Sequence, residues 1–289
     1  SHVRPRHDVY LDLAFFPYYA PNDPTFHTHF EQLGPIIETH GTPDDLQPLG
    51  ISWGVKGDHD RAAHFLRLAA AKLPNDPRVF YNLGVALGGI GRLAEAITSY
   101  QRALQLNPDY PLALHNLGIA FRRKGQLDEA IANYRKALQL KPDFPEALNN
   151  LGLAFARKSQ FDDAITSFQK ALQLNPEFSE ALNNLGLVLD RKGQHDEAIA
   201  SFQKALQLNP DYPIALTNLG AAFGQKGQLD DAIASFQKAL QLNPDYAKAH
   251  YGLALMLELK GDHEAAQREF AEAQRLDPSL KPPGETEEK

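Results

Sequence analysis

The sequence predicts an all-α solenoid built from about seven helix-turn-helix repeats. Two series of residues recur at intervals of 34 positions, and the apolar residues between them follow the spacing of amphipathic helices. The first series is proline: Pro74, Pro108, Pro142, Pro176, Pro210, Pro244 and Pro278. The second is glycine: Gly50, Gly84, Gly118, Gly152, Gly186 and Gly220. Each repeat is therefore expected to form one pair of helices.

A further glycine series divides each repeat into two helical stretches. It consists of Gly57, Gly91, Gly125, Gly193, Gly227 and Gly261, and Ser159 stands in the remaining place. Glycine commonly ends a helix and proline cannot continue one, so the first helix should end at this glycine and the second near the proline. The predicted organisation is an irregular N-terminal capping or groove-covering segment at 1–42, seven repeats at 43–278 and a polar tail at 279–289.

The apolar residues of one repeat show which faces the two helices bury. They are Leu114, Leu117, Gly118 and Phe121 in the first helix, and Leu127, Ala130, Ile131, Tyr134, Ala137 and Leu138 in the second. Acidic residues begin the second helices, at Asp128, Asp162, Asp196 and Asp230. Because carboxylates are favoured at the positive end of the helix macrodipole, these residues are expected to be solvated helix caps.

Composition excludes several classes of protein. A formal net charge of −7 argues against a phosphate-coating surface, so no nucleic-acid partner is expected. The absence of cysteine removes disulfides, thiol nucleophiles and Cys-ligated metals. No apolar run approaches the length of a membrane span. Met256 is the only methionine, so we expect that Ser1 is not the natural start. The compartment, cytoplasmic or periplasmic, stays open.

The repeated residues resemble the tetratricopeptide repeat (TPR) family across 43–278. The resemblance lies in a leading aromatic or leucine, a Leu-Gly pair, and then aromatic, alanine, aromatic, alanine and proline positions in register. It implies antiparallel helix pairs stacked into a right-handed superhelix whose first helices line a concave groove. The end repeats depart from the pattern, with Leu46, Trp53 and Leu66 in the first and His250 and Ala254 in the last.

The side of each first helix opposite its core carries two rows of polar residues. Asparagines form the first row and its neighbours: Asn82, Asn116, Asn149, Asn150, Asn183, Asn184 and Asn218. Arginines form the second: Arg123, Arg157 and Arg191. Val85, Ile119, Leu153, Leu187 and Ala221 lie between the rows.

Two interpretations of the asparagines stay open. Their amides suit the backbone of an extended peptide, or they brace neighbouring repeats with hydrogen bonds. The row resembles the asparagine-lined TPR groove of O-linked N-acetylglucosamine transferase, which implies a grip on peptide backbones. The arginines either favour an acidic ligand or simply complement the negative ends of their helices.

Three other patterns are weaker. Gly50–Gly54 matches a nucleophile elbow and Gly89–Gly91 part of a dinucleotide fingerprint, but both lie in helical register, so neither is expected to be catalytic. His27 and His29 are weak candidates for a metal site with Glu31 or Asp23.

The N-terminal segment is rich in apolar residues: Leu11, Leu13, Phe15, Phe16, Tyr18, Tyr19, Phe26 and Phe30. Such a segment should cover the open face of the first repeat or lie along the groove.

These observations favour a non-enzymatic, cofactor-free scaffold that binds an acidic or extended protein segment in its groove. Two alternatives stay open: a scaffold that assembles with itself through its ends or convex faces, giving homo-oligomers, or the recruiting arm of a larger enzyme.

Overall fold

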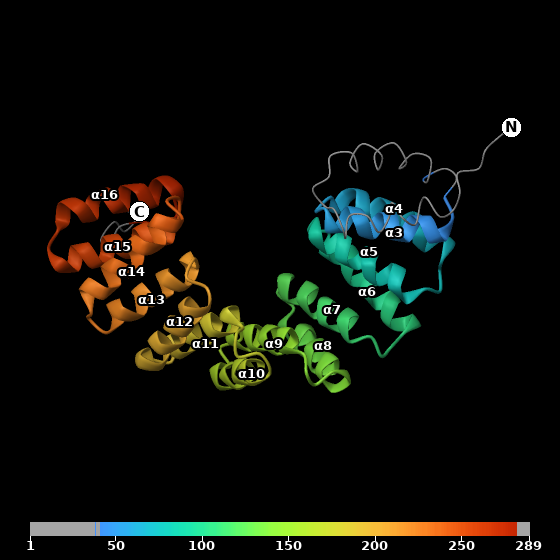
Figure 1. Cartoon of the computed structure of the whole chain (residues 1–289), viewed down its shortest axis with the longest axis horizontal. Helices are drawn as coiled ribbons and strands as arrows, with labels where there is room; N and C mark the ends of the chain where they lie inside the picture. Colours follow the sequence, from blue (N-terminus) through green and yellow to red (C-terminus); the bar gives the residue numbers. More distant parts are fainter. Residues whose placement is uncertain (1–37, 39–40, 282–289) are drawn as a thin grey trace, which may run out of the picture. The chain divides into compact units, whose positions relative to one another are not determined.

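The computed structural model describes residue 38 and residues 41–281, and within them it contains helices and no strand. Contacts divide the chain into two units, Ser1–Pro142 and Asp143–Lys289. In unit 1 the helices are α3 (Pro43–Val55), α4 (His59–Lys72), α5 (Pro77–Gly89), α6 (Leu93–Leu106), α7 (Pro111–Arg123) and α8 (Leu127–Leu140) (Figure 1). The predicted all-α solenoid of helix pairs is confirmed.

Unit 2 continues the same alternation of first and second helices. Its helices are α9 (Pro145–Arg157), α10 (Phe161–Leu174), α11 (Ser179–Arg191), α12 (His195–Leu208), α13 (Pro213–Gln225), α14 (Leu229–Leu242), α15 (Ala247–Lys260) and α16 (His263–Leu276). The expectations for residues 1–37 and 282–289, including the metal site at His27 and His29, lie outside the described residues.

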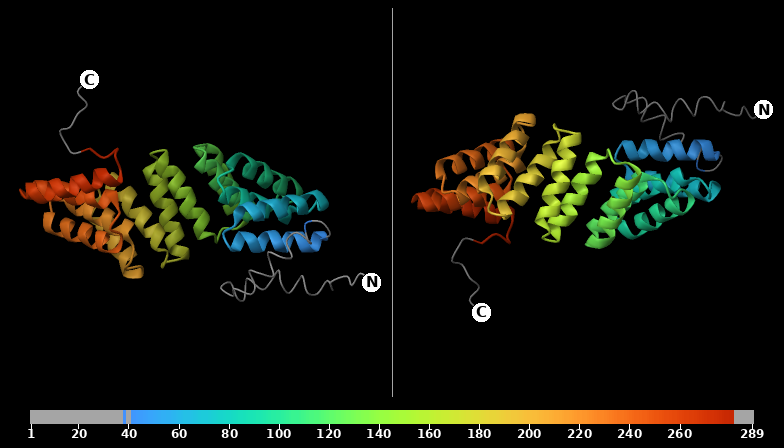
Figure 2. Two further views of the ribbon diagram at one scale, coloured as in Figure 1. Left: turned by 90° about the horizontal axis from the view of Figure 1, so that it is seen from above. Right: turned by 90° about the horizontal axis from the view of Figure 1, so that it is seen from below.

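Within each unit a helix packs mainly against its neighbours in sequence. The two helices of each pair lie side by side, and each second helix also contacts the next first helix (Figure 2). Successive first helices touch as well, as α11 touches α13. Because contacts are confined to adjacent repeats, a feature that recurs once per repeat forms a row along the unit.

Backbone geometry explains where the helices begin and end. Five first helices begin with proline at the position where a missing N–H costs nothing. Gly125 ends α7 with a left-handed φ of 80°, a conformation that glycine adopts without steric cost. Ser159 holds the same place after α9 with φ 59°, the one described non-glycine residue with positive φ.

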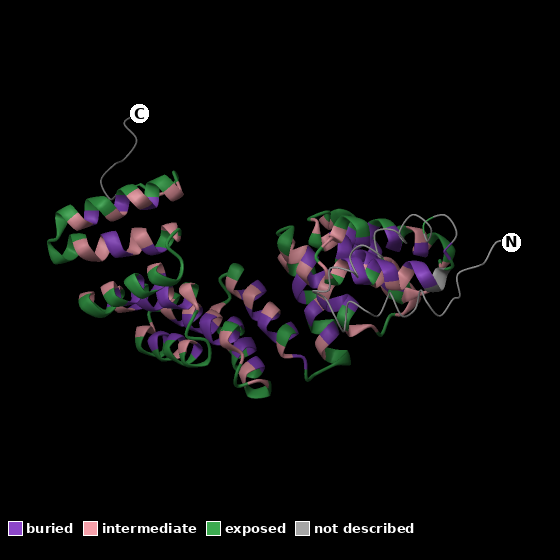
Figure 3. Cartoon of the chain, turned by 45° about the horizontal axis from the view of Figure 1, so that its top comes forward, coloured by how far each residue is buried: buried purple, intermediate pink, exposed green. Residues whose placement is uncertain are grey.

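The core of the five middle repeats depends on an aromatic ring placed against a glycine of the first helix, and in the first repeat Leu66 takes the place of the ring against Gly50. A Cβ added to Gly118 would stand 2.6 Å from Cε1 of Tyr134, whose side chain is fully buried. Gly84, Gly152 and Gly186 meet Tyr100, Phe168 and Phe202 in the same way. Buried residues lie on the helix sides that face a neighbour (Figure 3). Alanines such as Ala130 and Ala137 are fully buried. Small residues therefore set how closely the helices approach.

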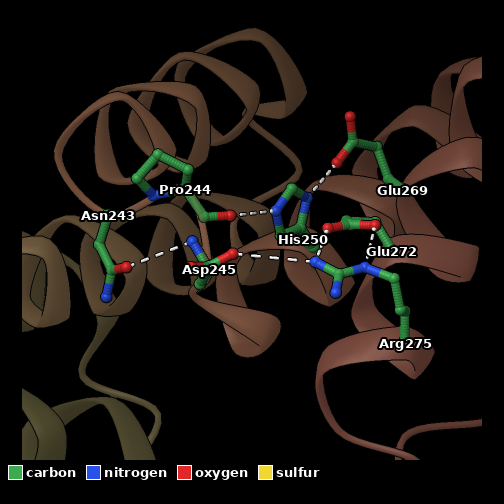
Figure 4. A network of polar contacts seen from close by, with 7 residues as sticks. All are labelled: Asn243, Pro244, Asp245, His250, Glu269, Glu272 and Arg275. Atoms are coloured by element: carbon green, nitrogen blue, oxygen red, sulfur yellow. Dashed lines mark hydrogen bonds and ion pairs between the residues drawn. The ribbon is translucent and has the colours of Figure 1, made fainter.

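The last repeat replaces a buried leucine with His250 and surrounds it with polar groups (Figure 4). His250 Nδ1 lies 2.5 Å from Oε2 of Glu269 on α16, and Nε2 lies 2.8 Å from the carbonyl oxygen of Pro244. Arg275 binds Glu272 through two hydrogen bonds and lies 3.8 Å from Asp245. This network ties α16 to α15 and to the connector before it, which explains the departure from the repeat pattern.

The glycine–aromatic contact predicts opposite effects of alanine at two glycines. Gly118→Ala should destabilise the protein by about 1–3 kcal/mol, because the new methyl group overpacks the ring of Tyr134. Gly54→Ala should stabilise it by up to about 1 kcal/mol, because a Cβ there meets only Ala62, at 3.7 Å, and alanine favours a helix. Urea unfolding measures both. Equal effects of the two substitutions would contradict this account of the core.

The buried tyrosines of unit 1 predict a loss of stability in alkali. Burial raises the pKa of Tyr100 and of Tyr134. In the unfolded chain tyrosine loses its proton near pH 10. The two buried, protonated tyrosines therefore contribute fully to the free energy of unfolding below about pH 10, and this contribution is lost as the pH rises further. When the pH is raised from about 8 to about 11, the melting temperature of Tyr100→Phe/Tyr134→Phe should therefore fall by less than that of the unchanged protein. Phe168 and Phe202 occupy the same places in unit 2, so the substitution suits the fold.

Candidate functional site

The exposed side of the first helices, opposite their paired second helices, carries the residues that the sequence singled out. We call this surface the first-helix face. The five first helices α5, α7, α9, α11 and α13 each contribute one half-buried asparagine of the row that the sequence singled out: Asn82, Asn116, Asn150, Asn184 and Asn218. The apolar and arginine rows lie one and two turns further along the same helices. Amide, apolar and cationic groups therefore share one surface within each unit.

In unit 2 the asparagines form hydrogen-bonded rungs between repeats. Asn184 Nδ2 donates to Oδ1 of Asn149 at 3.0 Å, and Asn218 Nδ2 donates to Oδ1 of Asn183 at 2.8 Å. The acceptors are buried, with only 8% of Asn149 and 3% of Asn183 exposed. These two asparagines thus lie beneath the first-helix face, and the bracing interpretation has direct geometric support. Each rung uses one amide N–H and leaves the carbonyl oxygen of Asn184 or Asn218 for another donor.

The rungs vary with the residues that neighbouring repeats supply. In unit 1, Asn116 Nδ2 donates to the hydroxyl of Tyr81 at 3.2 Å. The pKa of Tyr81 is raised, because the effect of burial outweighs the hydrogen bond from Asn116, which lowers it. Asn150 donates to the Glu146 carbonyl of its own helix at 3.0 Å. After Asn218 the row ends at Gly252, against which the ring of Phe236 packs.

The arginine row lies in the last turns of α7, α9 and α11, and its three side chains are exposed. Arg123 Nη1 donates to the Gly88 carbonyl, in the last turn of α5, at 2.8 Å. Placing cations at helix C-termini is favourable in itself, which the sequence anticipated. At the opposite ends of α9 and α11 the first-helix face carries Glu146 and Glu180, so in unit 2 it has one basic and one acidic edge.

Three lysines at the ends of first helices of unit 2 are already paired. Lys192, Lys226 and Lys260 bind Asp162, Asp196 and Asp230 of the preceding repeat. This corrects the expectation that these aspartates act as helix caps: the N-cap positions are Gln160, Gln194 and Gln228, and none of them makes a side-chain cap. The aspartates lie in the first turn, where the macrodipole favours them, and they link repeats by exposed ion pairs.

The sequence did not predict a cavity on the first-helix face of unit 1. It has a volume of about 210 Å³ and lies between α3, α4 and α5, with a mainly apolar lining that includes Ile51, Gly54, Val55, Asn82 and Val85. His59 also lines it, and its buried Nδ1 has no hydrogen-bond partner. At the equivalent places His195 and His263 bind Asp190 and Glu258, whereas unit 1 has Gly54 in place of the carboxylate. In the sequence, the glycine at position 54, where these repeats of unit 2 have a carboxylate, was the signal that could have indicated this cavity.

The described residues show no constellation for catalysis or metal binding at the other motifs. Gly50–Gly54 lies inside α3, and Gly89–Gly91 lies at the end of α5, so neither has the strand that its motif requires. Across residues 41–281 no group of three or more His, Asp or Glu side chains could hold a metal ion. In the same part of the chain no helix has the length and apolarity of a membrane span.

Helix pairs in which an aromatic ring packs against a glycine, as in the five repeats from Gly84 to Gly220, define a TPR solenoid. The model of the cilia and flagella-associated protein 70 C-terminal domain, a TPR domain family, matches residues 54–289, and the chain belongs to this family. No curated protein matches it.

Several solved structures are similar to the chain. MamA is 31% identical with a TM-score of 0.52, over 57% of this chain and 97% of MamA. YrrB, described as a TPR protein with an unusual peptide-binding site, is 25% identical with a TM-score of 0.52, over 65% of this chain and 96% of YrrB. A TPR protein from Parabacteroides merdae is 22% identical with a TM-score of 0.67, over 81% and 93% of the two chains, and shows the fold alone.

The rungs predict energetic coupling between asparagines of neighbouring repeats. In a double-mutant cycle, Asn149→Ala and Asn184→Ala should couple by about 1 kcal/mol, the usual net contribution of one such hydrogen bond. Chemical denaturation of the four proteins measures this coupling. Asn149→Ala combined with Asn218→Ala serves as the control, because these residues belong to different rungs and their effects should add. Coupling in the control pair as large as in the rung would contradict the bracing role.

Proposed function

We propose that the protein is a non-catalytic scaffold that binds an extended, acidic segment of another protein along its first-helix face. The observation that carries this proposal is the combination, in one unit, of amide carbonyls, an apolar row and exposed arginines on the same surface. Membership of a TPR family and similarity to solved TPR proteins, which support a role in protein interaction, are consistent with it.

The asparagine row suits a peptide backbone in its spacing. Packed helices lie about 8–10 Å apart, which is close to the length of three residues of an extended polyproline II chain at about 3.1 Å each, and every third main-chain N–H of such a chain points to the same side. A peptide running across α11 and α13 could therefore place one main-chain N–H opposite Asn184 and another opposite Asn218. Since the rungs hold both amides in place, little side-chain entropy is lost when a ligand binds.

The charges favour an acidic ligand at the arginine edge. Lys192 and Lys226 are matched by Asp162 and Asp196, so they add little net positive potential. Arg157 and Arg191 stand at the ends of their helices on the exposed surface, where a carboxylate can approach them. A guanidinium group binds a carboxylate through two parallel hydrogen bonds, which adds geometric selectivity.

Selection of peptides from a displayed library on the immobilised protein tests the proposal. We expect the selected peptides to be rich in Asp and Glu. Arg157→Gln/Arg191→Gln should weaken the best peptide by about tenfold in a titration at low salt, since two exposed ion pairs contribute up to about 1 kcal/mol each. Added salt should reduce this difference.

Lys204→Gln/Lys238→Gln is the matched control, because it removes the same charge from the second helices α12 and α14 of unit 2. It should leave the affinity nearly unchanged. Equal weakening by both pairs, or selection of peptides without acidic residues, would contradict a specific site at the arginine row.

A further inference from the structure

Exposed apolar residues of unit 1 are concentrated on its first-helix face. Ile51 and Val55 of α3 are 38% and 56% exposed, Val85 of α5 is 40% exposed and Leu112 of α7 is 45% exposed. On α4, by contrast, the described large apolar residues are buried or half-buried. A cluster of exposed apolar side chains on a folded protein usually marks a surface that another segment covers.

The cavity in this surface is large enough for one aromatic side chain. An engineered cavity of about 150 Å³ in another protein takes up benzene, and the cavity here measures about 210 Å³. Packing does not account for the glycine in its wall, because a Cβ on Gly54 would make only an ordinary contact with Ala62 at 3.7 Å. Gly50, another lining residue, is different, since a Cβ there would stand 2.6 Å from Leu66. Gly54 therefore lowers helix propensity and leaves space open.

The N-terminal segment of the same chain has the composition and the reach to fill this space. Between Leu11 and Phe30 it carries eight large apolar or aromatic residues and little charge to keep them solvated. The described chain begins against α4: Glu38 Oε1 lies 2.9 Å from Nε2 of His64, on the side of this helix opposite to Ala62 and Leu66, which line the cavity. The residues from Phe30 to Glu38 can extend over about 26 Å, more than twice the width of a helix.

We propose that an aromatic side chain from residues 11–30 occupies this cavity and makes the N-terminal segment an intramolecular competitor for the first-helix face of unit 1. Asn82 and Val85 line the same cavity, so a ligand reaches them only after the segment leaves. The inference rests on the proposed function only in treating this face as a binding surface. Because its test needs no partner protein, the experiment can contradict this inference without contradicting the proposed function, and the reverse.

The absence of cysteine makes the cavity accessible to a chemical test in the full chain. Val55→Cys places a single thiol at its rim, and its rate of reaction with dithionitrobenzoate reports whether the rim is covered. Phe15→Ser/Phe16→Ser/Tyr18→Ser/Tyr19→Ser/Phe26→Ser/Phe30→Ser in the same chain should raise that rate by about fivefold or more, since burial of one aromatic side chain favours docking by at least that factor. A synthetic peptide of residues 8–31 added to this variant should restore the slow rate.

Leu259→Cys is the control thiol, because Leu259 lies on the first-helix face of unit 2 and is 67% exposed. Its reaction rate should not respond to the serine substitutions, and thermal unfolding by circular dichroism verifies that the repeats remain folded. Equal rates for Val55→Cys with and without the substitutions would overturn the proposal. Protection that grows with protein concentration would also overturn it, by assigning the cavity to a second copy.

Discussion

The structure depends on one contact repeated along the chain, in which an aromatic ring of a second helix packs onto a glycine of its partner first helix. Gly118 with Tyr134 and Gly152 with Phe168 show it in the two units. Without a Cβ the first helix lets the ring approach its backbone, and buried alanines such as Ala137 let the neighbouring helix approach from the other side. Once this distance is set in each repeat, the surfaces of successive first helices come into register.

Because successive repeats are in register, residues that recur once per repeat form rows. The polar residues of these rows have different roles. One member of an Asn-Asn pair, such as Asn183, is buried and accepts a hydrogen bond, while Asn218 of the next repeat donates to it from the surface. Lys192, Lys226 and Lys260 are matched with aspartates of the preceding repeat, while Arg157 and Arg191 lie exposed on the first-helix face. Bracing and the proposed ligand binding would therefore use different atoms of these rows and do not exclude each other.

The two units offer different surfaces to a ligand although they share one fold. In unit 1 the first-helix face is apolar and contains a cavity whose wall includes Gly54. In unit 2 it is amide-rich, with arginine at one edge and glutamate at the other. A repeat protein can change its surface in this way because the residues that hold a repeat together are not those that face the groove. The covering of the apolar part by the N-terminal segment would make access to it a regulated step.

The sequence by itself determined the helix pairs, their ends and the small residues between them, because prolines, glycines and apolar spacing act on the nearby backbone. It also placed the asparagine and arginine rows on one helical side, which follows from the angle per residue alone. It could not show that Asn184 binds Asn149, nor that Asp162 pairs with Lys192 instead of capping its helix, since both partners lie a whole repeat away. The cavity beside Gly54 likewise exists only where three helices meet. Contacts between repeats depend on distances that packing sets, and for that reason only the tertiary structure decided them.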